Sequence, residues 1–108
     1  MELLKENGYP SDKLIDLIIK YKPTKELPIE KFITDFILAA WKYNGYSFDG
    51  TNLELHTYGW SGNEEIISAM HTNFCLREYP LQETKWERGG HYYFVVLKHG
   101  IDNYNSQY

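Results

Sequence analysis

The sequence is poor in cysteine, in excess positive charge and in long apolar runs, and each shortage excludes a class of protein. The single cysteine, Cys75, cannot form an internal disulfide framework. Fifteen acidic against eleven basic side chains give a net charge of -4, so the chain lacks the positive field that holds nucleic-acid backbones. No apolar run approaches the roughly 20 residues that cross a bilayer, and no signal-peptide core follows Met1. We therefore expect a cytoplasmic protein without a membrane segment, and nucleic acid is not an expected partner.

The length of the chain sets its domain organisation. With 108 residues there is room for one domain, and 43% hydrophobic with 24% charged residues is a globular composition. We expect a single α+β domain over residues 1–101. The segment 102–108 is polar and has no periodicity, which predicts a frayed tail.

Two segments in the first half have the period of amphipathic helices. The first has Ser11 or Asp12 as its N-cap and stops before Pro23, and the second begins near Pro28 and extends to residue 41. Asn44-Gly45 is expected to close the second helix with a left-handed cap. The apolar stripes that need a partner surface are Leu14, Leu17, Ile18, Tyr21, Ile29, Phe32, Ile33, Phe36, Ile37, Ala40 and Trp41.

After residue 45 the hydrophobic period changes to two, which predicts strands. A turn at Asp49-Gly50 joins two short extended segments, and a third helix follows Gly59-Trp60 and ends at Asn73. Extended segments are expected over 74–79 and 84–88, and Gly89-Gly90 connects into a central last strand over 91–97. The order α-α-β-α-β-β predicts a two-layer α+β sandwich with a small, mostly antiparallel sheet packed on helices.

The segment Gly59-Trp60-Ser61-Gly62-Asn63 lies where the third helix begins. Ser61 and Glu64 have the spacing of a capping box, in which each side chain bonds the amide of the other residue. The same segment has a second interpretation, because glycines before a helix N-terminus leave amide groups free to bind an anion. Glu64 and Glu65 oppose that interpretation, since they already supply negative charge there.

The segment Arg88-Gly89-Gly90-His91-Tyr92 forms the second candidate site. Its glycines permit the positive φ angles of a tight hairpin turn, which is a purely structural role. Arg88 and His91 flank this turn and can bracket a carboxylate or phosphate, with Trp86 or Tyr92 as a stacking surface. If the strand before the third helix pairs with the last strand, the Gly59 turn and the Gly90 turn come out at one edge. Trp60, Arg88 and His91 would then share a site for a small anionic or nucleotide-derived ligand.

The two motifs, Gly59 to Ile67 and Arg88 to Phe94, resemble a signature of small phage and prophage proteins. The likeness covers roughly residues 53 to 97 and does not include the two N-terminal helices. It implies an accessory protein that acts in a host bacterial cytoplasm, where such proteins often serve in counter-defence. It implies no catalytic residue.

No residues in the sequence identify an enzyme, a metal site or a cofactor. Ser61 lacks the glycine two positions later that the nucleophile elbow of hydrolases requires. His71 and Cys75 are four residues apart, and the scattered histidines have no metal-ligand spacing. We expect no catalytic residue, no metal and no cofactor, and we leave open whether the protein is an enzyme.

The aromatic content is high, with ten Tyr, three Trp and five Phe, or 17% of the chain. Tyr and Trp combine a large contact area with a polar group, so an excess favours binding surfaces. We therefore favour a non-enzymatic interaction module that binds a host protein or itself, with the small-ligand site as the alternative. Homodimerisation is expected through the apolar area of Phe36, Trp41, Tyr43 and Tyr46.

Overall fold

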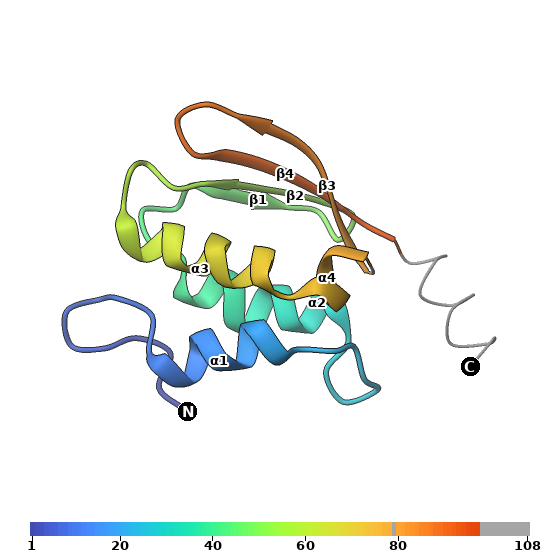
Figure 1. Cartoon of the computed structure of the whole chain (residues 1–108), viewed down its shortest axis with the longest axis horizontal. Helices are drawn as coiled ribbons and strands as arrows, with labels where there is room; N and C mark the ends of the chain where they lie inside the picture. Colours follow the sequence, from blue (N-terminus) through green and yellow to red (C-terminus); the bar gives the residue numbers. More distant parts are fainter. Residues whose placement is uncertain (79, 98–108) are drawn as a thin grey trace.

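The strands form one antiparallel sheet with the order β1-β2-β4-β3 (Figure 1). Their bounds are Tyr46–Phe48 for β1, Asn52–His56 for β2, Leu81–Glu87 for β3 and His91–Val96 for β4. This computed structural model describes residues 1–78 and 80–97. The last strand lies between β2 and β3, which confirms the prediction that it is central.

All the described helices lie on one side of this sheet (Figure 1). They are α1 (Asp12–Lys20), α2 (Ile29–Phe32) with the π-helical segment η1 (Ile33–Leu38), α3 (Ser61–Thr72) and α4 (Phe74–Glu78). Helices on one face of a small antiparallel sheet confirm the α+β class. None of the helices within the described ranges has the length and apolar character needed to cross a membrane.

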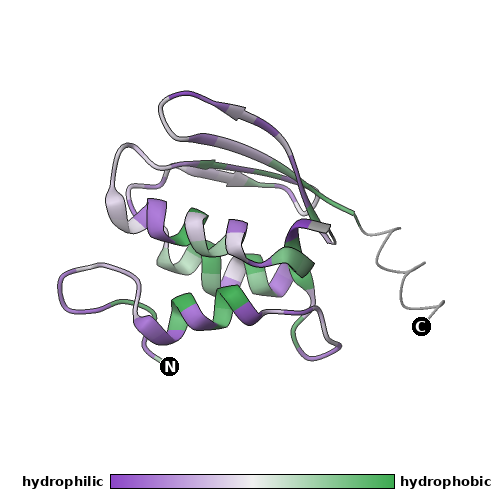
Figure 2. Cartoon of the chain, viewed as in Figure 1, coloured by the Kyte–Doolittle hydropathy of each residue, from purple (hydrophilic) through white to green (hydrophobic). Residues whose placement is uncertain are grey.

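The hydrophobic core lies between the helices and the inner face of the sheet. The strand register puts Leu53 opposite Phe94, and both side chains are buried. Figure 2 shows hydrophobic residues on α1 and α2, whereas the tip of the β3–β4 hairpin is hydrophilic. Ser11 caps α1, as its side-chain oxygen accepts a hydrogen bond from the Leu14 amide at 3.1 Å, which confirms one of the two predicted N-caps.

The second helix differs from the regular α-helix that its apolar spacing predicts. After the single turn of α2, residues Ile33–Leu38 adopt the wider π-helical conformation. Ile33, Ile37 and Trp41, each four residues apart, are all buried. The change of helical period therefore keeps the predicted apolar stripe in the core.

The prediction of an extended segment over 74–79 was wrong, because residues Phe74–Glu78 form helix α4; residue 79 lies outside the described ranges. A helix forms here because Asn73 has a second role. It ends α3, as predicted, and its side-chain oxygen also accepts the amide hydrogen of Leu76 at 2.9 Å. The capping bond begins a new helical turn where the apolar residues alone indicated a strand. The predicted tail over 102–108 also lies outside the described residues.

Asn73 also ties three helices together, and its replacement tests the helical layer. Its amide donates to the carbonyls of Ile18 and Tyr21, both at 2.8 Å, at the end of α1. We expect Asn73→Ala to lower the free energy of unfolding by about 2–4 kcal/mol, since it leaves buried backbone groups without partners. Urea denaturation measures the loss. The exposed Asn52→Ala variant should lose less than about 1 kcal/mol, and equal losses would contradict this role of Asn73.

Candidate functional site

The turns at Gly59 and at Gly89-Gly90 lie at the same end of the sheet, next to the ends of the central strands β2 and β4. The Thr57 amide, just after β2, donates to the Gly90 carbonyl at 2.9 Å. A Cβ atom on Gly90 would overlap with the hydroxyl oxygen of Thr57, so only glycine fits this approach. The prediction that the Gly59 and Gly90 turns come out at one edge is therefore confirmed.

The side chain of Trp60 nevertheless extends toward the N-terminal loop. Its ring packs on Tyr9 with ring centroids 4.5 Å apart and meets the edge of Tyr43 at 6.3 Å. The Lys42 ammonium lies 4.5 Å from the centroid of Trp60, within cation–π range. Trp60 thus joins residues from three loops, and no contact in residues 1–78 and 80–97 connects it to Arg88 or His91.

The polar residues of the first motif are bonded internally. The expected capping box is wrong: Trp60 is the N-cap of α3 and makes no side-chain cap. The hydroxyl of Ser61, which is the first helical residue, lies 2.6 Å from that of Tyr9. A Cβ atom on Gly62 would lie 2.5 Å from Nε1 of Trp60, so Gly62 makes room for the indole.

Asn63 is fully buried and holds the loop that follows the second helix. Its side-chain oxygen accepts from the Lys42 amide at 3.0 Å, and its side-chain nitrogen donates to the Lys42 carbonyl at 3.0 Å. The same nitrogen donates to the Thr57 carbonyl at 3.4 Å. Asn63 therefore positions residues 42 and 57, and its amide is already fully engaged within the protein.

Two exposed tyrosines lie next to the backbone groups that Asn63 holds, and both have an unusual backbone conformation. Tyr43 has a φ of 72° and Tyr58 a φ of 53°, and their exposed fractions are 59% and 63%. The predicted left-handed cap at Asn44-Gly45 is therefore shifted by one residue to Tyr43 and Asn44. Gly45 lies beneath the ring of Tyr58. Bulky residues rarely adopt positive φ, at a cost on the order of 1 kcal/mol or more each.

Tyr43, Tyr58, Gly59 and Trp60 line a shallow hollow of about 500 Å³, which we call the aromatic surface. Gly59 and Trp60 were among the predicted site residues, whereas Tyr58 was not, and Tyr43 was considered only for dimerisation. The signal that marks the two tyrosines is their position next to Asn44-Gly45 and Gly59, where left-handed turns are common.

His91 lies on the opposite face of the sheet, away from the helices. It faces His56 across β2 and β4, and the Nδ1 atoms of the two rings are 2.8 Å apart. On the same face the hydroxyl of Tyr93 donates to Glu87 at 2.9 Å. This hydrogen bond and the charge of Lys85 lower the pKa of Glu87. The same hydrogen bond, together with desolvation and the negative charge of Glu87, raises the pKa of the Tyr93 phenol.

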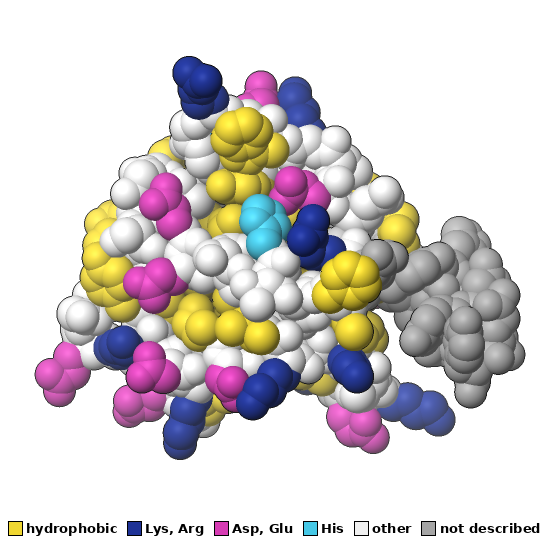
Figure 3. Space-filling view, in the orientation of Figure 1, with side chains coloured by type: hydrophobic (Ala, Val, Ile, Leu, Met, Phe, Trp, Pro, Cys, Tyr) yellow, Lys and Arg dark blue, Asp and Glu magenta, His cyan; other side chains and the backbone are white. Residues whose placement is uncertain are grey.

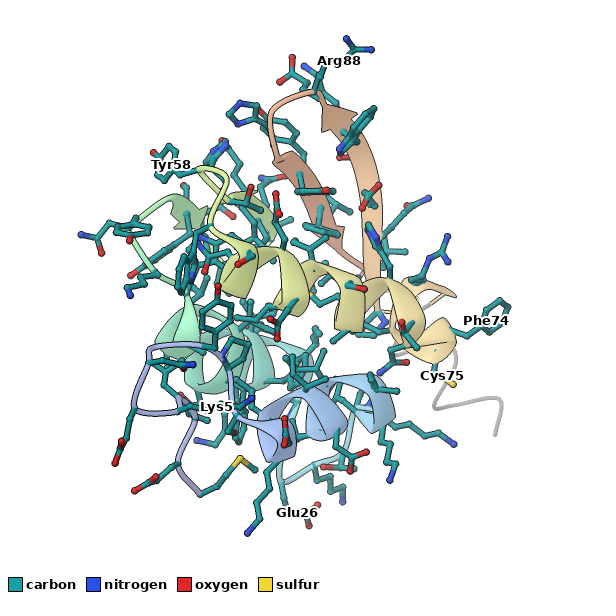
Figure 4. All side chains as sticks on the ribbon, turned by 60° about the vertical axis from the view of Figure 1, so that its left-hand side comes forward. Lys5, Glu26, Tyr58, Phe74, Cys75 and Arg88 are labelled. Atoms are coloured by element: carbon teal, nitrogen blue, oxygen red, sulfur yellow. The ribbon has the colours of Figure 1, made fainter. Side chains whose placement is uncertain are left out.

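The rest of the second motif points in other directions. Arg88 is exposed at the tip of the β3–β4 hairpin and extends away from the body of the molecule, far from Tyr58 in the view of Figure 4. Gly89 has a φ of 99°, as the hairpin turn requires. Tyr92 is half-buried on the helix side of the sheet, where its ring lies 5.8 Å from that of His71. The predicted site residues thus lie at the same end of the sheet, but their side chains point in three different directions.

A larger cavity of about 570 Å³ lies between α3, α4 and β3. His71 and Glu83 line it, with His71 Nε2 2.7 Å from a carboxylate oxygen of Glu83. Cys75, four residues after His71, is an exposed free thiol. Among the residues that the structure describes, no group of three or more His, Cys, Asp or Glu side chains is arranged to hold a metal ion.

Charged side chains of both signs alternate over the face shown in Figure 3. Basic and acidic groups lie next to one another there, with apolar groups between them. This face has no continuous basic track of the kind that binds a phosphate backbone.

No family model matches this chain, and neither a curated protein nor a solved structure matches it. The resemblance of the two motifs to phage proteins therefore stays a prediction.

The contact between the two turns gives a stability test. Gly90→Ala introduces both a strained φ and an overlap with the buried Thr57, whereas Gly50→Ala introduces the strain alone, since nothing lies within 4 Å of its new Cβ. We expect losses of about 1 kcal/mol for Gly50→Ala and at least about 2 kcal/mol more for Gly90→Ala in urea denaturation.

A double-mutant cycle tests whether the larger stability loss of Gly90→Ala comes from its contact with Thr57. In the Thr57→Ala background, which lacks the hydroxyl, Gly90→Ala should cost less than in the parent protein. Equal costs for Gly50→Ala and Gly90→Ala would mean that the turns do not touch in solution.

Proposed function

We propose that this protein is a non-enzymatic interaction module that binds a protein partner through the aromatic surface of Tyr43, Tyr58, Gly59 and Trp60. The observation that carries the proposal is the pair of exposed tyrosines in left-handed backbone conformations beside Trp60. Folding alone does not favour such positions, so the backbone strain supports a role in contact with another molecule.

The chemistry of the aromatic surface suits a protein partner. Trp and Tyr are the residues that most often dominate binding energy at protein interfaces, because their large rings lose little conformational entropy. Tyr9 and Lys42 support Trp60 from the side, and the buried Asn63 fixes the backbone of Lys42. A rigid support of this kind lowers the entropy cost of binding.

The alternative, a small anionic ligand held jointly by Trp60, Arg88 and His91, receives less support. Trp60 contacts the N-terminal loop, His91 contacts His56, and Arg88 extends from the hairpin tip. Ser61 and Asn63 form hydrogen bonds within the protein. The interaction module is therefore the better supported of the two functions.

The setting of the interaction comes from the motif resemblance alone. An accessory protein of a phage or prophage would meet its partner, a host protein or a second copy of itself, in the host bacterial cytoplasm. A role in counter-defence belongs to the same proposal. The aromatic surface is compatible with both kinds of partner, because it needs only an apolar or cationic complement.

Replacement of the two tyrosines tests the proposal directly. Tyr43→Asn/Tyr58→Asn removes both rings, and asparagine tolerates positive φ, so the fold should be retained. We expect the immobilised parent protein to capture a specific host protein, or to form dimers in sedimentation equilibrium. The double variant should reduce that binding at least about 100-fold, as loss of hot-spot side chains does.

Phe74→Asn is the matched control, since Phe74 is 69% exposed and lies far from Tyr58 (Figure 4). The control should bind as the parent does. The proposal is wrong if the parent is monomeric and captures no protein that the double variant loses. A melting-temperature increase with nucleotides that Trp60→Ala or Arg88→Ala abolishes would support the small-ligand function instead.

A further inference from the structure

His56 and His91 lie outside the aromatic surface and form a close pair of imidazole rings. The two residues are direct partners in the β2–β4 register, so their side chains project from the same face of the sheet. Their Nδ1 atoms are 2.8 Å apart, and their ring planes are inclined by 62°. No described helix covers this face (Figure 1), so both rings can be reached from solvent.

A nitrogen pair at this distance shares one proton. One ring must carry hydrogen on Nδ1 and donate it to the lone pair of the other. Glu54 favours one arrangement, because its carboxylate lies 3.5 Å from Nε2 of His56 and favours hydrogen on that atom. His56 then presents the lone pair of Nδ1, and His91 donates. If the proton of His91 moves to its own Nε2, both Nδ1 atoms present a lone pair to the space where the two rings meet.

The surrounding charges favour a cation at that position. Glu54 lies beside His56, and Glu87 is the cross-strand partner of His91. The Lys85 ammonium opposes them, since it lies 3.7 Å from a carboxylate oxygen of Glu87. The carboxylate near His56 is also the kind of outer partner that orients a metal-ligating imidazole.

The two nitrogens are close enough to bind one ion. Two nitrogens about 2.05 Å from an ion lie about 2.9 Å apart at a ligand angle of 90°, and about 3.3 Å apart at the tetrahedral angle. The 2.8 Å separation is that of the hydrogen-bonded pair, and a small movement of the rings reaches either value. Imidazole nitrogen is a preferred ligand of Cu²⁺ and Ni²⁺, and Cu²⁺ binds most tightly among the divalent first-row ions.

We propose that His56 and His91 form a two-histidine clamp for a divalent transition-metal ion, Cu²⁺ or Ni²⁺, bound through both Nδ1 atoms. Water completes the coordination. The ion replaces the shared proton, which moves to Nε2 of His91, so binding to the neutral pair releases no net proton. This inference is independent of the proposed protein interaction.

Titration with Ni²⁺ tests the clamp in untagged protein carrying Cys75→Ser, which removes the exposed thiol as a competing ligand. We expect one saturable site by isothermal titration calorimetry, with a rise in melting temperature on binding. His56→Ala and His91→Ala should each lower the affinity at least about 10- to 100-fold, the range seen even for the loss of outer partners. The double variant His71→Ala/His99→Ala removes the chain's other two histidines and should bind as the parent does.

A spectroscopic readout makes the result independent of stability. Electron paramagnetic resonance of the Cu²⁺ complex should show coupling to two imidazole nitrogens, reduced to one in either single variant. The absence of a saturable site, or binding that survives both single variants, overturns the clamp.

Discussion

The pairing of β2 with β4 is the interaction on which the rest of the structure depends. These two central strands put Leu53 and Phe94 on the inner face and His56 and His91 on the outer face. A shift of register by one residue would reverse both faces, because side chains alternate along a strand. The Thr57–Gly90 hydrogen bond continues the pairing to the turn that leads into α3.

The loops at this end of the molecule are held by side chains that sequence motifs alone do not explain. Asn63 is buried within α3 but bonds the backbone of Lys42, 21 residues away. Gly62 makes space for the indole of Trp60, and Ser61 bonds Tyr9 from the N-terminal loop. The first motif therefore builds a rigid corner, and the groups left free for a partner are the neighbouring rings of Tyr43 and Tyr58.

The two candidate sites differ in position and chemistry. The aromatic surface is formed by two loops beside the N-terminus of α3 and is supported by the N-terminal loop, and its large rings and supporting cation suit a protein surface. The histidine pair lies on the open face of the sheet between carboxylates, which suits a cation. Both depend on the same β2–β4 register, so they share a scaffold without sharing side chains.

The sequence by itself determined the α+β class, the first helix with a cap at Ser11 or Asp12, and the central position of the last strand. These features follow from hydrophobic period, capping residues and glycine turns, which act between near neighbours. Only the tertiary structure decided the helix at 74–78, the contacts of Trp60 and the meeting of His56 with His91. Trp60 and His91 meet partners far away in the chain, Tyr9 and His56. The cap of the helix at 74–78 is local, but its Asn73 is held in place by the end of α1. A local pattern holds no information about which distant group will complete a hydrogen bond or a ring contact, because strand register and helix packing bring the two together.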